Sequence, residues 1–234
     1  VLKEATAEIK ELAPSENQFV EHISCDATDL ERLKPLLEGF IKKHGVPDYL
    51  FNVVGYALPD YVENYTLEDF KKNMDVNYYG QLVPILILLP HFKREGRGHF
   101  INFSSMMGYF GIMGYAAYCP TKFAIVGLSE ALRHELKPYG IKVSIVYPPD
   151  TDTPAFEREN KNKPEECKML SESGGILQPE EVADQVIEGV LDQDFHIAPG
   201  ESGMIRWLYR HFPKLVQWVT DRDYRKARKK LGKK

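Results

Sequence analysis

Tyr118 and Lys122 form a pair whose residue types and spacing could do proton-transfer chemistry. They lie four residues apart at the start of a predicted helix, so both side chains project from the same face. A phenol has a pKa of about 10 and transfers protons poorly at pH 7, whereas a nearby ammonium stabilises the phenolate and lowers that pKa. The pair therefore predicts a tyrosine acid or base, although a Tyr and a Lys at this spacing are also common on ordinary helices.

Two polar residues elsewhere in the chain favour the catalytic interpretation. Ser105 lies 13 residues before Tyr118, just past the end of a predicted strand, where its hydroxyl could hydrogen-bond a substrate carbonyl oxygen. Asn77 lies inside a predicted helix, where asparagine is unfavourable unless its amide has a task, such as holding a water in a proton chain.

Apolar runs of strand length alternate with helical patterns, and this order positions the candidate residues. Strands are predicted at 19–24, 49–54, 100–103, 143–147 and 195–198, and helices at 30–43, from Thr66 onward, at 118–137 and at 179–191. Near-continuous apolar strands between helices indicate an α/β fold, a doubly wound parallel sheet covered on both faces. Ligands of such sheets bind beyond the carboxyl ends of the strands, which is where Ser105 lies.

Composition excludes several classes of protein. The chain has 234 residues with 30 Lys and Arg against 34 Asp and Glu, a formal charge of −4, so it is not a basic nucleic-acid binder. Its longest apolar run, at 85–89, is far short of the ~20 residues that a membrane span needs. Cys25, Cys119 and Cys167 form no close pair, and the seven histidines never pair at metal-ligand spacing. We therefore expect no metal and a reducing, cytoplasmic compartment.

Asn77, Ser105, Tyr118 and Lys122 together resemble the motifs of the short-chain dehydrogenase/reductases. Asp26 and the Asn52-x-x-Gly55 turn extend the resemblance, which runs from about residue 19 to 155. It implies a Rossmann-type reductase in which Tyr118 is the general acid/base and Ser105 polarises the carbonyl. It also implies that Lys122 holds the nicotinamide ribose and lowers the pKa of Tyr118, and that Asn77 anchors a water relay.

The same resemblance implies a nicotinamide cofactor and residues that bind it. Asp26 would hydrogen-bond the adenine, Asn52 would line the cofactor cleft, and Thr153 would hold the nicotinamide carboxamide. Further cofactor contacts are expected from Gly55, Tyr118, Lys122, Pro148 and Thr151.

A longer string identifies a subgroup within that family. Where the family usually has Pro-Gly, this chain has Pro148-Pro149, and the string from Tyr147 to Pro154 is similar to that of the 3-ketodihydrosphingosine reductases. The similarity continues at Phe156, Glu159-Asn160, Lys163-Pro164 and Glu166. It implies NADPH-dependent reduction of a lipid-like ketone in sphingolipid synthesis. Reduction of another ketone, such as a 3-oxoacyl thioester, a sterol or a sugar, stays an alternative.

Reductases of this family open with a strand, a glycine-rich turn, a helix and a second strand, and no such turn is found here. Gly108, Gly111 and Gly114 have the wrong spacing and follow the wrong strand. We therefore expect the sequence to begin about one βαβ unit late, so that 1–203 is a partial Rossmann-type domain of a longer enzyme. The missing turn favours a third alternative, a non-catalytic interaction protein that keeps the fold. The intact set of four site residues weighs against that alternative.

Residues 204–234 read as a separate amphipathic and basic segment. Apolar residues recur there at helical intervals beside Trp207 and Trp218, and 222–234 hold eight basic residues and one acid. Such a segment can lie on an anionic membrane surface, or its apolar face can cover the substrate cleft or pack in a dimer. Eukaryotic members of the subgroup sit on the cytosolic face of the endoplasmic reticulum, whereas bacterial members lack that compartment, so a cytoplasmic protein is expected, with membrane association at the endoplasmic reticulum if it is eukaryotic. By resemblance the helix at 118–137 also forms a dimer interface, so a homo-oligomer is expected.

Overall fold

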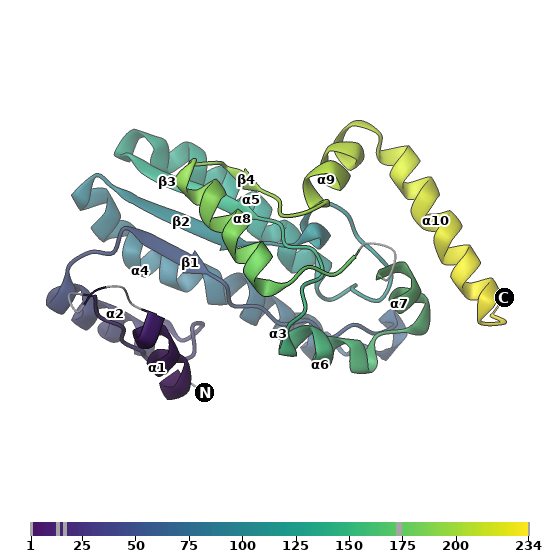
Figure 1. The fold of residues 1–234 in the computed structure, drawn as a ribbon, viewed down its shortest axis with the longest axis horizontal. Coiled ribbons are helices and arrows are strands. Elements are labelled where there is room, and N and C mark those ends of the chain that lie inside the picture. Colours follow the sequence, from purple (N-terminus) through teal and green to yellow (C-terminus); the bar gives the residue numbers. More distant parts are fainter. Residues whose placement is uncertain (1, 13–14, 16–17, 172–174, 234) are drawn as a thin grey trace.

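Four parallel strands form one sheet in the computed structural model, which describes residues 2–12, 15, 18–171 and 175–233 (Figure 1). The strands are β1 (Tyr49–Asn52), β2 (Gly98–Phe103), β3 (Ile141–Val146) and β4 (His196–Ile197), and they are hydrogen-bonded in that order. Asn52 stands opposite Asn102, and Phe103 stands opposite Val146. The carboxyl ends of the strands therefore meet at one edge, as the sequence predicts.

Helices connect these strands and flank the sheet. In the described residues they are α1 (Leu2–Leu12), α2 (Leu30–His44), α3 (Leu67–Met74), α4 (Gly80–Glu95), α5 (Cys119–Leu136), α6 (Pro154–Asn162), α7 (Glu165–Ser171), α8 (Pro179–Leu191), α9 (Ser202–His211) and α10 (Pro213–Lys230). The segment Asp75–Tyr79 between α3 and α4 is a turn of π-helix. The predicted helices at 30–43, 118–137 and 179–191 are confirmed, and Thr66 caps α3 by the predicted exchange of hydrogen bonds with Asp69.

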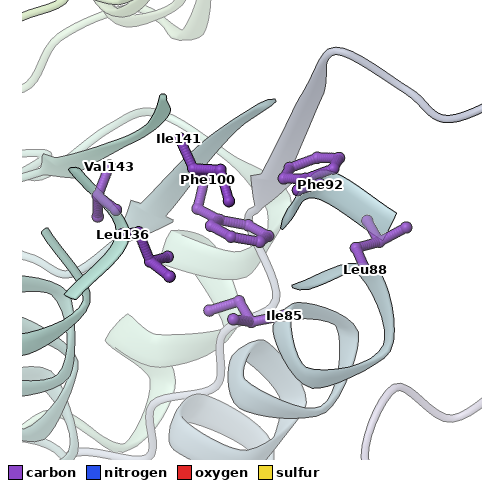
Figure 2. Packing of buried hydrophobic residues seen from close by; sticks show 7 residues of the cluster. All are labelled: Ile85, Leu88, Phe92, Phe100, Leu136, Ile141 and Val143. Carbon is purple, nitrogen blue, oxygen red and sulfur yellow. The ribbon is translucent and has the colours of Figure 1, made fainter. Parts of the chain in front are cut away.

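The core has two layers, one on each face of the sheet. Phe100 and Ile101 follow each other on β2, so their side chains point to opposite faces. Phe100 lies in a cluster with residues of α4, α5 and β3, namely Ile85, Leu88, Phe92, Leu136, Ile141 and Val143 (Figure 2). Ile101 packs against Val146, Ile197 and three valines of α8. The helices α4 and α5 thus cover one face and α8 covers the other, which confirms the doubly wound α/β fold.

The predicted strand at 19–24 is wrong, because this segment packs against a helix and not into the sheet. Residues 18–26 are irregular. The ring of Phe19 stacks on that of His44 with centroids 3.9 Å apart, and Glu21 pairs with Lys43 and His44 at the end of α2. A strand needs a neighbour for its backbone hydrogen bonds, and no described strand lies beside this segment.

The two last helices form a hairpin at the end of the molecule away from α1 (Figure 1). Helix α10 packs against α7 and α9. Beyond α10, Lys233 donates hydrogen bonds to the Tyr61 hydroxyl over 2.8 Å and to the buried carboxylate of Glu166 over 3.0 Å. None of the described helices combines the length and apolarity needed to cross a bilayer.

Candidate active site

The start of α5 places Tyr118 and Lys122 one turn apart. Tyr118 is the residue before the helix, and Pro120 occupies a first-turn position at which its missing N–H costs no hydrogen bond. Lys122 is 3% exposed, and its ammonium lies 5.4 Å from the centroid of the Tyr118 ring. Its Nζ donates a hydrogen bond to the Phe103 carbonyl oxygen over 2.9 Å. The two side chains therefore share a face of the helix at the end of β2.

Ser104 and Ser105 follow β2 and reach α5 in different ways. The hydroxyl of buried Ser104 donates to the Lys122 carbonyl oxygen over 2.9 Å, which fixes α5 to the end of the strand. Ser105 Oγ accepts from the Met107 backbone N–H over 3.2 Å, and the Ser105 hydroxyl is close enough to that of Tyr118 to lower the pKa of the phenol. The structure thus brings the Ser105 and Tyr118 hydroxyls together.

Burial dominates the electrostatics of the pair. Burial raises the pKa of Tyr118, the nearby Glu159 carboxylate raises it further, and the hydrogen bond with Ser105 lowers it less. Burial also lowers the pKa of Lys122, to about 8. The pKa of Tyr118 is thus raised overall, because desolvation of the phenolate outweighs the effect of Ser105, and the lowering of this pKa by Lys122 stays a prediction. Tyr118 is a fully protonated phenol at neutral pH.

Asn77 holds the loop that follows β1. It lies in the π-helical turn with no exposed surface, its Oδ1 accepts from the Tyr56 N–H over 2.7 Å, and its Nδ2 donates to the Tyr56 carbonyl over 2.8 Å. Single π turns inside α-helices are often found at functional sites. A Cβ added to Gly55 would lie 3.7 Å from Asn77 Oδ1 and 3.8 Å from Lys122 Nζ. These three residues therefore meet behind Tyr118.

Asn52 and Asp26 are engaged within the protein. Asn52 Nδ2 donates to Asn102 Oδ1 over 2.9 Å, and Asn102 in turn donates to the Ser129 hydroxyl over 2.9 Å. This buried polar chain links β1, β2 and α5. Asp26 is exposed, and its Oδ1 accepts from the backbone N–H and the hydroxyl of Thr28, which lowers the pKa of Asp26.

A cavity of about 420 Å³ opens beside Tyr118 and Ser105. It is also lined by three of the predicted cofactor residues, Pro148, Thr151 and Thr153. Thr153 caps α6 by accepting from the Phe156 N–H over 3.2 Å, so that residues 148–153 form one wall. Asp26, Asn52, Gly55, Asn77 and Lys122 do not line this cavity. The predicted site residues therefore fall into two groups. One group lines the cavity, and the other lies outside the cavity wall.

Sequence reasoning missed most of the remaining cavity wall. Tyr115 hydrogen-bonds Glu159 of α6, and both face the cavity. The apolar lining of the cavity includes Ile205 of α9 with Val216 and Val219 of α10. The motif string from 147 to 166 includes Glu159, but only the fold shows that it faces Tyr118.

Comparisons with known proteins decide the family. Residues 1–164 match the family model described as short chain dehydrogenase. This chain belongs to the short chain dehydrogenase family. A short-chain dehydrogenase from Streptomyces avermitilis has a similar structure, with a TM-score of 0.72 and 26% identity over 92% of this chain and 83% of that chain. The NAD⁺-bound xylitol dehydrogenase shares the fold, with a TM-score of 0.75 at 22% identity over 84% of this chain and 83% of that chain.

Two relatives are more similar in sequence. A 3-dehydrosphinganine reductase of Danio rerio is 40% identical over 203 residues, which make up 86% of this chain and 61% of that protein. A 3-ketodihydrosphingosine reductase of Dictyostelium discoideum is 42% identical over 183 residues, 76% of this chain and 55% of that protein. The short chain dehydrogenase described here thus spans about three fifths of the length of these relatives.

The residues behind Tyr118 fit the nicotinamide ribose of the cofactor that this family uses. An ammonium has three N–H donors, and within the described part of the chain Lys122 Nζ uses one, on the Phe103 carbonyl. A buried ammonium with two free donors needs further acceptors, and ribose hydroxyls provide them. Gly55 has no side chain and leaves the approach to this ammonium open. Lys122 and Tyr118 therefore supply donors suited to a sugar diol, and Gly55 leaves room for it.

Proposed function

We propose that the full-length protein uses NADPH to reduce the ketone of 3-ketodihydrosphingosine to dihydrosphingosine in sphingolipid synthesis. The observation that carries this proposal is that Tyr118 and Ser105 meet at the wall of a cavity lined largely by apolar residues, with the Lys122 ammonium behind the tyrosine ring. The names of relatives at 35–42% identity support the substrate.

In this mechanism Ser105 and Tyr118 act on the ketone oxygen. When bound, the nicotinamide would supply a hydride for the carbonyl carbon. As that carbon accepts the hydride, its oxygen develops alkoxide character, and the Ser105 hydroxyl stabilises the charge by a hydrogen bond. Tyr118 then delivers its proton to the oxygen. An alkoxide is a stronger base than a phenolate, so the raised pKa of Tyr118 does not prevent this transfer.

Lys122 and Asn77 support the proton donor. The Lys122 ammonium, 5.4 Å from the ring centroid, stabilises the Tyr118 phenolate that remains after proton transfer. Lys122 also holds the ribose hydroxyls. Asn77 fixes the loop at Tyr56 and, through that loop, anchors the water relay that returns a proton to the site.

The other predicted residues contact more distant parts of NADPH. Thr153, with Pro148 and Thr151, holds the nicotinamide from the cavity wall that they share with Tyr118. Asn52 and Gly55 line the cleft at the end of β1, and Asp26 hydrogen-bonds the adenine.

The C-terminal segment 204–234 gives the protein a lipid-facing surface. Val216, Val219 and Ile205 line the cavity and suit an alkyl chain. On the outside of the hairpin several large apolar side chains are exposed by half or more, namely Met204, Trp207, Phe212, Leu215 and Trp218. Together with the basic residues of α10 they favour peripheral contact with an anionic membrane from the cytoplasmic side, at the endoplasmic reticulum in a eukaryote.

A homo-oligomer is also part of this proposal. Phe123 on α5 and Leu86 on α4 are 44% and 50% exposed, although both helices cover the sheet. A second copy that packs on this outer surface would bury them. Light scattering of the protein and of Phe123→Glu tests this, and a monomeric wild-type protein would contradict it.

The function is tested by NADPH oxidation with the full-length protein. We expect a short-chain 3-ketodihydrosphingosine to be reduced with a higher kcat/KM than a 3-oxoacyl thioester, a sterol ketone or a keto sugar. A higher kcat/KM for any of these three would overturn the substrate assignment. No oxidation with any of them, together with no binding of NADPH, would favour a non-catalytic protein.

A further inference from the structure

Three carboxylates line the cavity. Asp223 pairs with Arg222 and Lys226, whereas the other two have no such pair of cations and ketone reduction does not require them. These two, Asp150 and Glu159, line the cavity with Ser105 and Tyr118. Burial raises the pKa of both carboxyl groups, which shows that the cavity is a poor solvent for their charge. Neither proton transfer by Tyr118 nor polarisation by Ser105 is helped by a negative charge there. A carboxylate in this position therefore needs another reason.

One carboxylate oxygen of Glu159 is engaged within the protein, and the other is available to a ligand. The Tyr115 hydroxyl donates a hydrogen bond to Glu159 Oε1, and the rings of Tyr115 and Tyr118 lie 5.8 Å apart. In the described part of the chain no hydrogen bond reaches Glu159 Oε2, and the side chain is only partly buried. A carboxylate has about four acceptor sites, so Oε2 can accept from a ligand in the cavity.

The charges around the cavity do not balance. Lys163 is 3% exposed and lowers the pKa of both Asp150 and Glu159 by its charge. Its Nζ, however, lies over the Phe156 ring at 4.8 Å from the centroid and donates to Ser171 Oγ over 3.5 Å. Two carboxylates facing one ammonium leave one negative charge in a partly desolvated space. Such a charge is costly unless a cation comes to it.

Glu159 is also close to the reacting atoms. Its charge is the second largest influence on the pKa of Tyr118, after burial. The ketone oxygen has to contact the Tyr118 hydroxyl, so a group on the carbon next to the ketone lies in the same corner of the cavity as Glu159.

We propose that Glu159, assisted by Asp150, binds a protonated amine on the carbon next to the ketone and so selects 2-amino ketones over neutral ketones. This inference rests on the proposed function, because 3-ketodihydrosphingosine carries an amine on that carbon. The bound ammonium would also neutralise Glu159 and remove an influence that makes Tyr118 a weaker acid. The substrate would thereby improve its own proton donor.

The test compares two ketones on the full-length protein with NADPH. One is a short-chain 2-amino-1-hydroxy-3-ketone, and the other is the same ketone without the amine. A hydrogen bond to a charged group contributes enough that we expect Glu159→Gln to raise KM for the amino ketone by at least ~10-fold. KM for the neutral ketone should stay within about twofold. Glu157→Gln removes the same charge from an exposed position two residues away on α6, and it should change neither KM.

A binding measurement separates this inference from the proposed function. Calorimetry of the protein with the short-chain 2-amino-1,3-diol, and with the diol without the amine, requires no turnover. We expect Glu159→Gln to weaken binding of the amine at least ~10-fold and to leave the neutral diol unchanged. A wild-type protein that binds the amine selectively but reduces neither ketone would overturn the proposed function and support the inference.

Three outcomes would overturn the inference. The first is that Glu159→Gln weakens binding of both diols equally, which would mean that Glu159 only positions Tyr115. The second is equal binding of both diols by the wild-type protein. If Glu159→Gln does not fold, binding of the two diols to Asp150→Asn is measured instead. The third outcome is that this variant prefers the amine as strongly as the wild-type protein does.

Discussion

Lys122 donates a hydrogen bond from Nζ to the carbonyl oxygen of Phe103, the last residue of β2, over 2.9 Å. The backbone of the sheet, and not a flexible loop, thus fixes the ammonium beside the Tyr118 ring. The same carbonyl accepts a second hydrogen bond, from Gln81 Nε2 over 2.9 Å. Helices α4 and α5 are therefore both tied to the atom that positions the ammonium.

Replacement of Tyr118 by Phe should lower the rate of ketone reduction at least ~100-fold, because it removes the proton donor. NADPH affinity, measured by fluorescence titration, should stay within about threefold, since the ring is retained. Tyr139→Phe removes a hydroxyl from an exposed residue in the short turn after α5 and should have no effect. Retention of more than a tenth of the rate by Tyr118→Phe would refute the role of the hydroxyl.

Lys122→Met should abolish activity and yet stabilise the fold at pH 7. The pKa of Lys122 is about 8 in the folded protein against an ordinary value of 10.5, so the unfolded chain binds more protons between those pH values. The free energy of unfolding of the wild-type protein should therefore rise by up to about 3 kcal/mol from pH 8 to 10.5.

Urea unfolding at pH 7 and pH 10 measures this effect. The Met variant should lack the rise that the wild-type protein shows. A variant less stable than the wild-type protein at pH 7 would mean that the hydrogen bond to Phe103 outweighs the desolvation of the ammonium.

Acid should destabilise the protein through His99. This residue is 3% exposed, and burial lowers its pKa to about 4 from an ordinary 6.5. Ser144 Oγ donates to the Asp194 carbonyl over 2.6 Å, so it accepts from His99 Nε2 at 2.7 Å, which fixes the neutral tautomer. Between pH 6.5 and 4 the unfolded chain takes up a proton that the folded protein does not. The free energy of unfolding should therefore fall by up to about 3 kcal/mol as the pH falls from 6.5 to 4.

His99→Gln keeps a donor for Ser144 and does not titrate. Its free energy of unfolding should fall less between pH 7 and pH 5 than that of the wild-type protein. His134→Gln, at an exposed position on α5, should behave like the wild-type protein. An equal pH dependence for all three proteins would exclude His99 as the source.

Vesicle binding should depend on the outer face of the α9–α10 hairpin. Trp207 and Trp218 are 53% and 54% exposed, and Trp→Ser at both positions should weaken co-sedimentation with anionic vesicles at least ~10-fold. Leu191→Ser removes a similarly exposed apolar side chain from α8 and should have no effect. Binding should also fall with added salt and be weak on neutral vesicles. Equal sedimentation of all variants would contradict the membrane contact.

Local sequence signals predicted the elements that carry the site. The Thr66 cap, the ends of α8 and the spacing of Tyr118 and Lys122 are encoded within a few residues of the features they specify. The strand predicted at 19–24 is wrong, because an apolar run of strand length does not show which partner covers it. The raised pKa of Tyr118 could not be predicted for a similar reason. Burial and the Glu159 charge come from segments joined only by the fold.

The contacts in and behind the cavity wall could not be predicted from the sequence either. The contact between Tyr115 and Glu159 joins residues 44 apart, and the buried chain from Asn52 to Asn102 joins residues 50 apart. Neither has a pattern that could be read along the chain. Motifs therefore identified the residues at the ketone oxygen, whereas recognition of the rest of the substrate needed the three-dimensional arrangement.

The π turn at Asp75–Tyr79 makes this stretch intolerant of changes in length. Removal of one residue would rotate every later side chain of α4 by about 100° around the helix axis. Asn77 could then stay on Tyr56, or Gln81 could stay on the Phe103 carbonyl, but not both. A single-codon deletion here would be more damaging than most substitutions, because it would put the two halves of the helix out of phase.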